Sequence, residues 1–244
     1  MISVALIGPD GAGKTTTSRL VERSLPIGAR YVYMGANPES SNVLLPTSRL
    51  ITSIRRASRN RRNRNAASNG KLEPPKHARL RQSAIGRFVA WLRSYLRLVN
   101  LLAEECFRHG LVTYYQKRGL VVLLDRWFFA DFYAYEATDQ KKQPLSKRIH
   151  QRMLDKVYPK PDLVIYLDLP ATVLYARKGE GTVESLERNR QKYLMLRNVV
   201  EHYFVINANQ EKEEVVSAVV TLILTFYKAK TSGNLPATMS CTQI

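Results

Sequence analysis

The sequence has few of the residues that build disulfide-rich, metal-clustered or membrane-spanning proteins. Two cysteines in 244 residues, Cys106 and Cys241, lie too far apart to suggest a disulfide framework and fit a reducing, cytoplasmic compartment. The four histidines show no metal-ligand spacing. The longest apolar stretch, Val215 to Tyr227, has thirteen residues and includes hydroxyl side chains, so it predicts a buried terminal helix rather than a membrane span. Because an apolar run starts at residue 2, we expect no secretory signal.

Acidic residues are scarce in one part of the chain. The formal net charge is +18, and between Arg49 and Arg97 fourteen Lys and Arg stand against a single acid, Glu73, a local excess of +13. Hydrophobic periodicity also fails over residues 39–84, where arginines alternate with Asn and Ser. We therefore predict a mobile basic insertion, with a short helix near residues 44–54. Nucleic acid or an anionic surface is a candidate partner for this insertion.

A phosphate-binding signature stands at the amino end. The apolar run Ile2 to Ile7 predicts a buried strand, and it leads into G-x-x-x-x-G-K-T, a Walker A phosphate loop. Glycines let the backbone curl so that amide N–H groups point at phosphate oxygens. We expect Lys14 to reach the β and γ phosphates of ATP and the Thr15 hydroxyl to ligate Mg²⁺. The ATP-binding residues predicted here are Gly8, Asp10, Gly11, Ala12, Gly13, Lys14, Thr15 and Thr16.

Short apolar segments alternate with helical ones along the rest of the chain. This alternation predicts an α/β protein with the three-layer P-loop NTPase fold, a five-stranded parallel sheet and helices on both faces. We expect one domain over residues 1–228, interrupted by the basic insertion, and a frayed tail over 229–244. The expected strands are 2–7, 30–34, 120–124, 163–167 and 204–206, and the main helices 85–117, 129–137, 144–157, 170–178, 183–203 and 211–228.

The helix expected over residues 85–117 is long and amphipathic. Its aromatic residues Phe88, Trp91 and Tyr95 recur at three- and four-residue steps. We interpret them as the face that packs on the core. The alternative is that they lie on anionic lipid, next to Arg87 and Arg93.

Two strand ends carry further candidate site residues. Ligands bind beyond the carboxyl ends of parallel strands, so we expect these residues to line one crevice with the phosphate loop. Asp125 and Arg126 follow a buried strand; the carboxylate suits Mg²⁺ held through water, and the guanidinium suits a second phosphate. The alternative is an internal salt bridge at the strand end. Asp168 ends another strand, where it could equally cap the helix that Pro170 opens.

A group of cations flanks a glycine loop at residues 179–181. Phosphoryl transfer spreads negative charge over the moving group, so cations that close over it are expected. The alternative for each is a solvated helix face. The four residues are Arg177, Lys178, Arg188 and Arg190.

Together these stretches resemble the thymidylate kinases, a family of nucleoside monophosphate kinases. The resemblance covers residues 1–35 and about 90–228, and it leaves the basic insertion out. The matching stretches are Gly8–Thr16, Leu124–Trp127, Pro161–Asp168 and Arg177–Tyr193.

The resemblance implies transfer of the ATP γ-phosphoryl group to a nucleoside monophosphate, dTMP first, with Mg²⁺ at Thr15 and Asp125. It implies that Asp10 contacts the acceptor sugar and Arg126 grips the acceptor phosphate. One class of the family has an arginine in the phosphate loop, where this chain has Gly11, so the catalytic cation is expected from the lid. Ala208 matches the stretch that borders adenine. The implied catalytic residues are Lys14, Asp125, Arg126, Arg177 and Arg188.

The chain departs from the family where the acceptor base is recognised. Met34 to Pro38 replaces an Arg-Glu-Pro-Gly stretch, and Glu104 stands at the position of a base-contacting arginine, with Arg97 and Arg108 nearest. Trp127 replaces the usual tyrosine. A kinase for another small acceptor, and an ATP-dependent protein that binds nucleic acid or a membrane surface, therefore stay open as alternatives. A homodimer is a further expectation on which the sequence does not decide.

Overall fold

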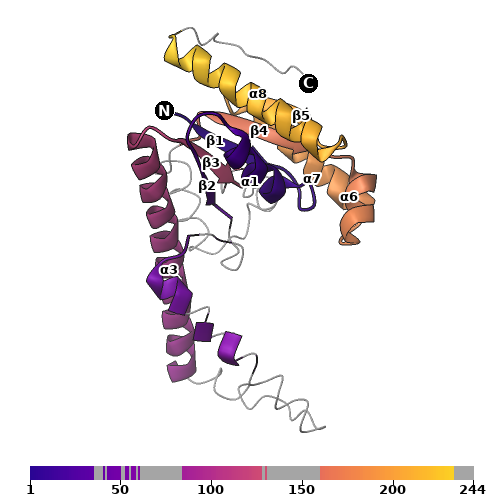
Figure 1. The fold of residues 1–244 in the computed structure, drawn as a ribbon. Coiled ribbons are helices and arrows are strands. Elements are labelled where there is room, and N and C mark those ends of the chain that lie inside the picture. Colours follow the sequence, from indigo (N-terminus) through magenta and orange to yellow (C-terminus); the bar gives the residue numbers. More distant parts are fainter. Residues whose placement is uncertain are drawn as a thin grey trace.

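The fold was examined in a computed structural model, which describes residues 1–35, 41, 43–50, 53–54, 56–58, 60, 84–127, 130 and 160–233. Strands and helices alternate in chain order (Figure 1). The strands are β1 (Ser3–Ile7), β2 (Ala29–Tyr33), β3 (Val121–Asp125), β4 (Leu163–Asp168) and β5 (Tyr203–Asn207). The helices are α1 (Lys14–Ser24), α3 (Ala84–Lys117), α6 (Ala171–Lys178), α7 (Val183–Met195) and α8 (Lys212–Thr231), with a 3₁₀ turn at Leu196–Asn198.

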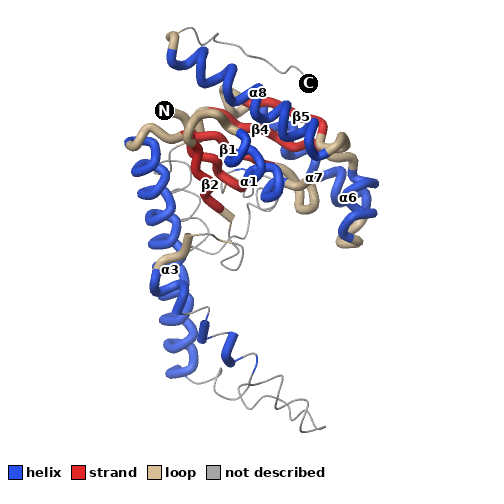
Figure 2. The backbone as a smooth tube through the Cα atoms, in the orientation of Figure 1, coloured by secondary structure: helices blue, strands red, loops and turns tan. Residues whose placement is uncertain are grey.

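The five strands form one parallel sheet in the order β2-β3-β1-β4-β5 (Figure 2). This arrangement confirms the predicted α/β fold and its five-stranded sheet. In the register, Asp125 stands opposite both Leu6 of β1 and Tyr33 of β2. The strand ends that carry candidate site residues therefore lie along one edge of the sheet.

Apolar layers cover both faces of the sheet. On one face α1 and α8 pack over β1 and β4, with Val21, Val219 and Phe226 fully buried. This packing confirms the buried terminal helix expected from residues 215–227. On the other face, Tyr166 of β4 stacks on Tyr193 of α7, with ring centroids 5.5 Å apart. None of the helices in the described parts of the chain is long and apolar enough to span a membrane.

Helix α3 corrects one expectation. Its carboxyl-terminal half packs on the sheet, where Val112 is buried, but the other half extends well past the sheet (Figure 1). Phe88 and Trp91 are 61% exposed and Tyr95 is 52% exposed, so the interpretation of these aromatics as a core face is wrong. The reason is length: a 34-residue helix spans about 50 Å, whereas a five-residue strand spans about 17 Å.

The basic insertion is described only in part. Residues 46–50 are helical, within the short helix predicted over 44–54. This segment is fixed to α3, since the Leu45 N–H donates to Glu104 (3.1 Å) and the Asn100 amide donates to Ser48 (3.1 Å). The helix predicted over 183–203 is too long: residues 199–202 are not helical, and Tyr203 begins β5. Residue 130 is helical, as predicted, but the rest of the expected helix 129–137 lies outside the described residues. So do the expected helix 144–157, most of the insertion and the end of the tail.

Candidate active site

The phosphate loop joins β1 to α1 at the centre of the sheet edge. Gly8 has φ 149°, and a Cβ there would lie 2.9 Å from the Leu167 carbonyl oxygen, so the loop can approach β4 only with glycine. Lys14 is buried, and its ammonium group donates to the carbonyls of Gly8 (2.8 Å) and Pro9 (2.7 Å). The loop thus holds its lysine against its own backbone.

Asp10 brings two cations together from distant parts of the chain. The Lys14 ammonium lies 3.5 Å from Asp10 Oδ1, and the Arg126 guanidinium donates to the same oxygen. Burial alone would raise the pKa of Asp10, but Lys14 and Arg126 outweigh burial and hold the pKa below its ordinary value. Lys14 and Arg126 therefore lie on the same side of the sheet edge.

The backbone of Arg126 is unusual. Its φ of 75° makes it the one non-glycine residue with positive φ in the described parts of the chain. The Arg126 N–H donates to the Leu6 carbonyl (3.1 Å), which ties this turn to β1. The residue thus leaves β3 in a direction that carries its side chain to Asp10, with which it forms an ion pair.

Asp125 is the most enclosed charged group of the site. The residue is fully buried, and its Oδ2 accepts hydrogen bonds from the Thr15 hydroxyl (2.6 Å) and the Tyr31 hydroxyl (2.8 Å). Its Oδ1 has no hydrogen-bond partner among the described residues. A buried carboxylate with one unsatisfied oxygen beside a threonine hydroxyl fits a hard divalent cation such as Mg²⁺. Thr15 and Asp125, predicted separately, thus lie together.

Tyr31 is a site residue that the sequence did not reveal. Burial, with Asp125 next to it, raises the pKa of Tyr31 far above its ordinary value, so the hydroxyl stays protonated and can donate. The Arg19 guanidinium lies over the ring, 5.5 Å from its centroid. In the sequence Tyr31 is only one residue of an alternating strand, and its contact with Asp125 depends on the pairing of β2 with β3.

The predicted lid cations separate into two groups. Arg177, near the end of α6, lies over the phosphate loop, with its Nη1 3.4 Å from the Gly11 carbonyl oxygen. Lys178 packs on the same loop, since a Cβ at Gly11 would lie 3.5 Å from its Cγ. Arg188 is exposed on α7, and no hydrogen bond or ion pair joins it to the loop in the described structure.

Arg190 belongs to a fixed ion pair. Its guanidinium donates through Nε and Nη2 to both oxygens of Asp168, each at 2.7 Å, and through Nη1 to Glu187. The idea that Asp168 caps the following helix is wrong: α6 begins after Pro170 and has no side-chain cap. Asp168 instead anchors α7 to the end of β4.

We expect Arg190→Lys to destabilise the fold by about 2 kcal/mol, because a lysine cannot make the two-point bond to Asp168. Urea unfolding followed by circular dichroism measures this difference. Arg188→Lys, two residues away on the same helix and exposed, is the matched control and should change little. Equal stability of the two variants would contradict the anchoring role.

A buried ion pair supports the end of β2 from α3. Arg108 lies 3.3 Å from Glu104 and donates to the Gly35 carbonyl (2.8 Å). A side chain on Gly35 would overlap the Tyr33 hydroxyl and Arg126, so Glu104 and Arg108 hold the backbone that packs against Arg126. The sequence singled out position 104 only for its departure from the family.

The remaining predicted residues lie at the same edge. Ala208 follows β5, and its N–H donates to the Asp168 carbonyl (2.7 Å). Ala12 is buried and Thr16 is exposed on the first turn of α1.

Comparison with known proteins shows which proteins this chain is similar to. A probable thymidylate kinase of Pyrobaculum aerophilum is 28% identical over 229 residues, which cover 91% of this chain and 96% of that protein. By sequence, this chain is similar to proteins named as probable thymidylate kinases. Probable thymidylate kinases of Saccharolobus solfataricus and Archaeoglobus fulgidus are each 30% identical, over 109 and 121 residues. The aligned part spans only 54% and 59% of those two relatives.

The solved structures agree on the fold. A thymidylate kinase from Candida albicans superposes with a TM-score of 0.56 at 16% identity, covering 92% of this chain and 91% of its own. No family model matches the chain. The likeness to this solved thymidylate kinase is therefore one of fold, over most of the chain.

Proposed function

We propose that the protein transfers the γ-phosphoryl group of ATP to a nucleoside monophosphate, with dTMP as the acceptor. The observation that carries this proposal is the meeting of Lys14 and Arg126 at one oxygen of Asp10. One cation belongs to a phosphate loop and the other to a neighbouring strand end. Donor and acceptor phosphates bound by these two residues would lie next to each other, as transfer requires.

In this proposal each residue has a separate task. The backbone of Gly8 to Gly13 surrounds the donor phosphates, and Lys14 exchanges its bonds to the loop carbonyls for phosphate oxygens. Arg126 binds the acceptor phosphate, and Asp10, ionised because of its two cations, contacts the acceptor sugar. Thr15 and Asp125 would hold Mg²⁺, which neutralises phosphate charge when bound.

The lid supplies the cation that the phosphate loop lacks. Gly11 has no side chain, and Arg177, whose Nη1 lies 3.4 Å from the Gly11 carbonyl oxygen, takes the role of neutralising the charge that develops on the transferred group. Arg188 would join it only after α7 moves. Ala208 borders the adenine of ATP. We also propose a cytoplasmic location, which the small number of cysteines favours.

The acceptor is tested with a panel of nucleoside monophosphates and labelled ATP. We expect transfer to dTMP at rates well above those for the purine monophosphates. The competing result is faster transfer to another pyrimidine monophosphate. The buried pair of Glu104 and Arg108 favours it, because in the thymidylate kinases an arginine that contacts the base is expected where this chain has Glu104. Faster transfer to another pyrimidine monophosphate would reject dTMP but keep the kinase, and no transfer to any member would reject both.

A further inference from the structure

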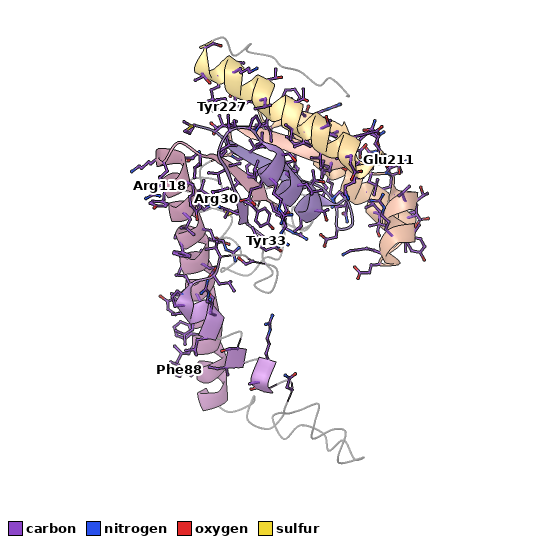
Figure 3. The ribbon with its side chains drawn as sticks, viewed as in Figure 1. Arg30, Tyr33, Phe88, Arg118, Glu211 and Tyr227 are labelled. Atoms are coloured by element: carbon purple, nitrogen blue, oxygen red, sulfur yellow. The ribbon has the colours of Figure 1, made fainter. Side chains whose placement is uncertain are left out.

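The half of α3 that extends past the sheet carries an exposed apolar stripe. Six large side chains follow helical spacing on one face, and each is between 38% and 61% exposed. Figure 3 labels Phe88 near the end of this half, far from the sheet and the phosphate loop. The stripe consists of Phe88, Trp91, Leu92, Tyr95, Leu96 and Val99.

The aromatic part of the stripe is ordered. The rings of Phe88 and Trp91 stack with centroids 6.1 Å apart, and those of Trp91 and Tyr95 with centroids 5.8 Å apart. Leu50 and Ile54, which are 61% and 56% exposed, add apolar surface on the segment that is hydrogen-bonded to α3. An exposed patch of this kind marks an interaction surface.

The chemistry of the occupant follows from charge. The stretch from Arg49 to Arg97 has an excess of +13, and both of its ends are attached near the stripe. The segment just before it docks on α3 through Ser48 and Asn100, and its last residues belong to α3 itself. Arg49 and Arg56 of the docked segment are exposed, and the sequence of α3 has no acidic residue before Glu104. The partner chemistry that complements this part of the chain is therefore anionic.

We propose that this face binds an anionic lipid surface, with the stripe in the interface and Arg49 and Arg56 near the lipid headgroups. Tryptophan and tyrosine beside aliphatic side chains suit a membrane interface, and cations add attraction to anionic lipid. A second copy of the chain would bring the same excess of positive charge against this one. Nucleic acid would leave Leu92, Leu96 and Val99 without apolar partners.

The experiment uses the full chain and sedimented vesicles. We expect binding to vesicles of phosphatidylcholine with about one third phosphatidylglycerol, weak binding to pure phosphatidylcholine, and release at high salt. The variant Phe88→Ser/Trp91→Ser/Leu92→Ser should reduce partitioning at least tenfold. Met195→Ser, a 55% exposed apolar side chain on α7, is the matched control and should bind like the wild type.

Tryptophan fluorescence gives a second measurement that does not depend on that triple variant. Trp91 is 61% exposed and Trp127 only 5% exposed, so vesicles should shift the emission of Trp91 alone. Trp91→Phe should still sediment with anionic vesicles but lose the shift. A shift that persists in Trp91→Phe would overturn the proposed contact.

Three other results would also overturn it: equal binding to neutral and anionic vesicles, unchanged binding by the triple variant, and failure to bind vesicles at all. If the last were accompanied by tight binding to duplex DNA, or by a dimer that the triple variant abolishes, the surface would belong to that partner instead. ATP binding, measured separately, tests the phosphate loop and stays independent of every outcome here.

Discussion

Lys14→Met is expected to lower kcat/KM for phosphoryl transfer about a thousandfold. The ammonium group is the cation of the phosphate loop, and methionine keeps the length of the side chain while removing the charge that stabilises the transition state. Steady-state kinetics with ATP and the best acceptor measures the effect. ATP binding should weaken as well, because the same charge contacts the donor phosphates.

The control for this variant is a lysine outside the site. Lys212→Met, on the first turn of α8, removes a 57% exposed charge and should leave turnover unchanged. Circular dichroism shows whether Lys14→Met keeps its secondary structure. A folded Lys14→Met protein with wild-type turnover would remove Lys14 from the mechanism and, with it, the proposed arrangement of phosphates along the loop.

Arg108→Ala is expected to destabilise the protein by about 3–5 kcal/mol. It leaves the Glu104 carboxylate buried without its cation and takes away the donor to the Gly35 carbonyl. Urea unfolding gives the free energy, and the turnover of the folded fraction should also fall because Gly35 packs against Arg126.

Two further variants separate the ion pair from simple loss of volume. Glu104→Gln/Arg108→Met removes both charges and should recover a large part of the lost stability. Arg118→Ala, at an exposed residue just after the carboxyl end of the same helix, loses a contact with the Tyr114 ring and should cost less than 1 kcal/mol. A cost below 1 kcal/mol for Arg108→Ala would show that the pair does not support β2.

The parts of the site that were predicted from sequence are those set by local chemistry. Gly8, Gly13, Lys14 and Thr15 lie within one stretch of eight residues. The motif alone therefore predicts the phosphate loop. Asp125 was found because a charged residue at the end of a buried strand must lie at the sheet edge, next to that loop.

The parts that were missed depend on pairing between distant segments. Arg190 and Asp168 are 22 residues apart, and their bond requires α7 to fold back on β4. Periodicity predicted one apolar face for α3 but could not show that the sheet ends before the helix does, so Phe88, Trp91 and Tyr95 were assigned to the core. Glu104 and Arg108 have i,i+4 spacing, but their contacts with Leu45 and Gly35 come from the tertiary fold.

At Arg126 the needs of stability and of the proposed activity are opposed, because its left-handed backbone conformation favours glycine whereas phosphate binding requires the arginine side chain. A side chain in this conformation costs about 1 kcal/mol or more relative to glycine, and the N–H bond to Leu6 keeps it there. Selection for heat resistance alone would therefore favour glycine at 126, and selection for catalysis would restore the guanidinium. Under the proposed function, an arginine stands at 126 because binding the acceptor phosphate needs its charge more than the fold needs a relaxed turn.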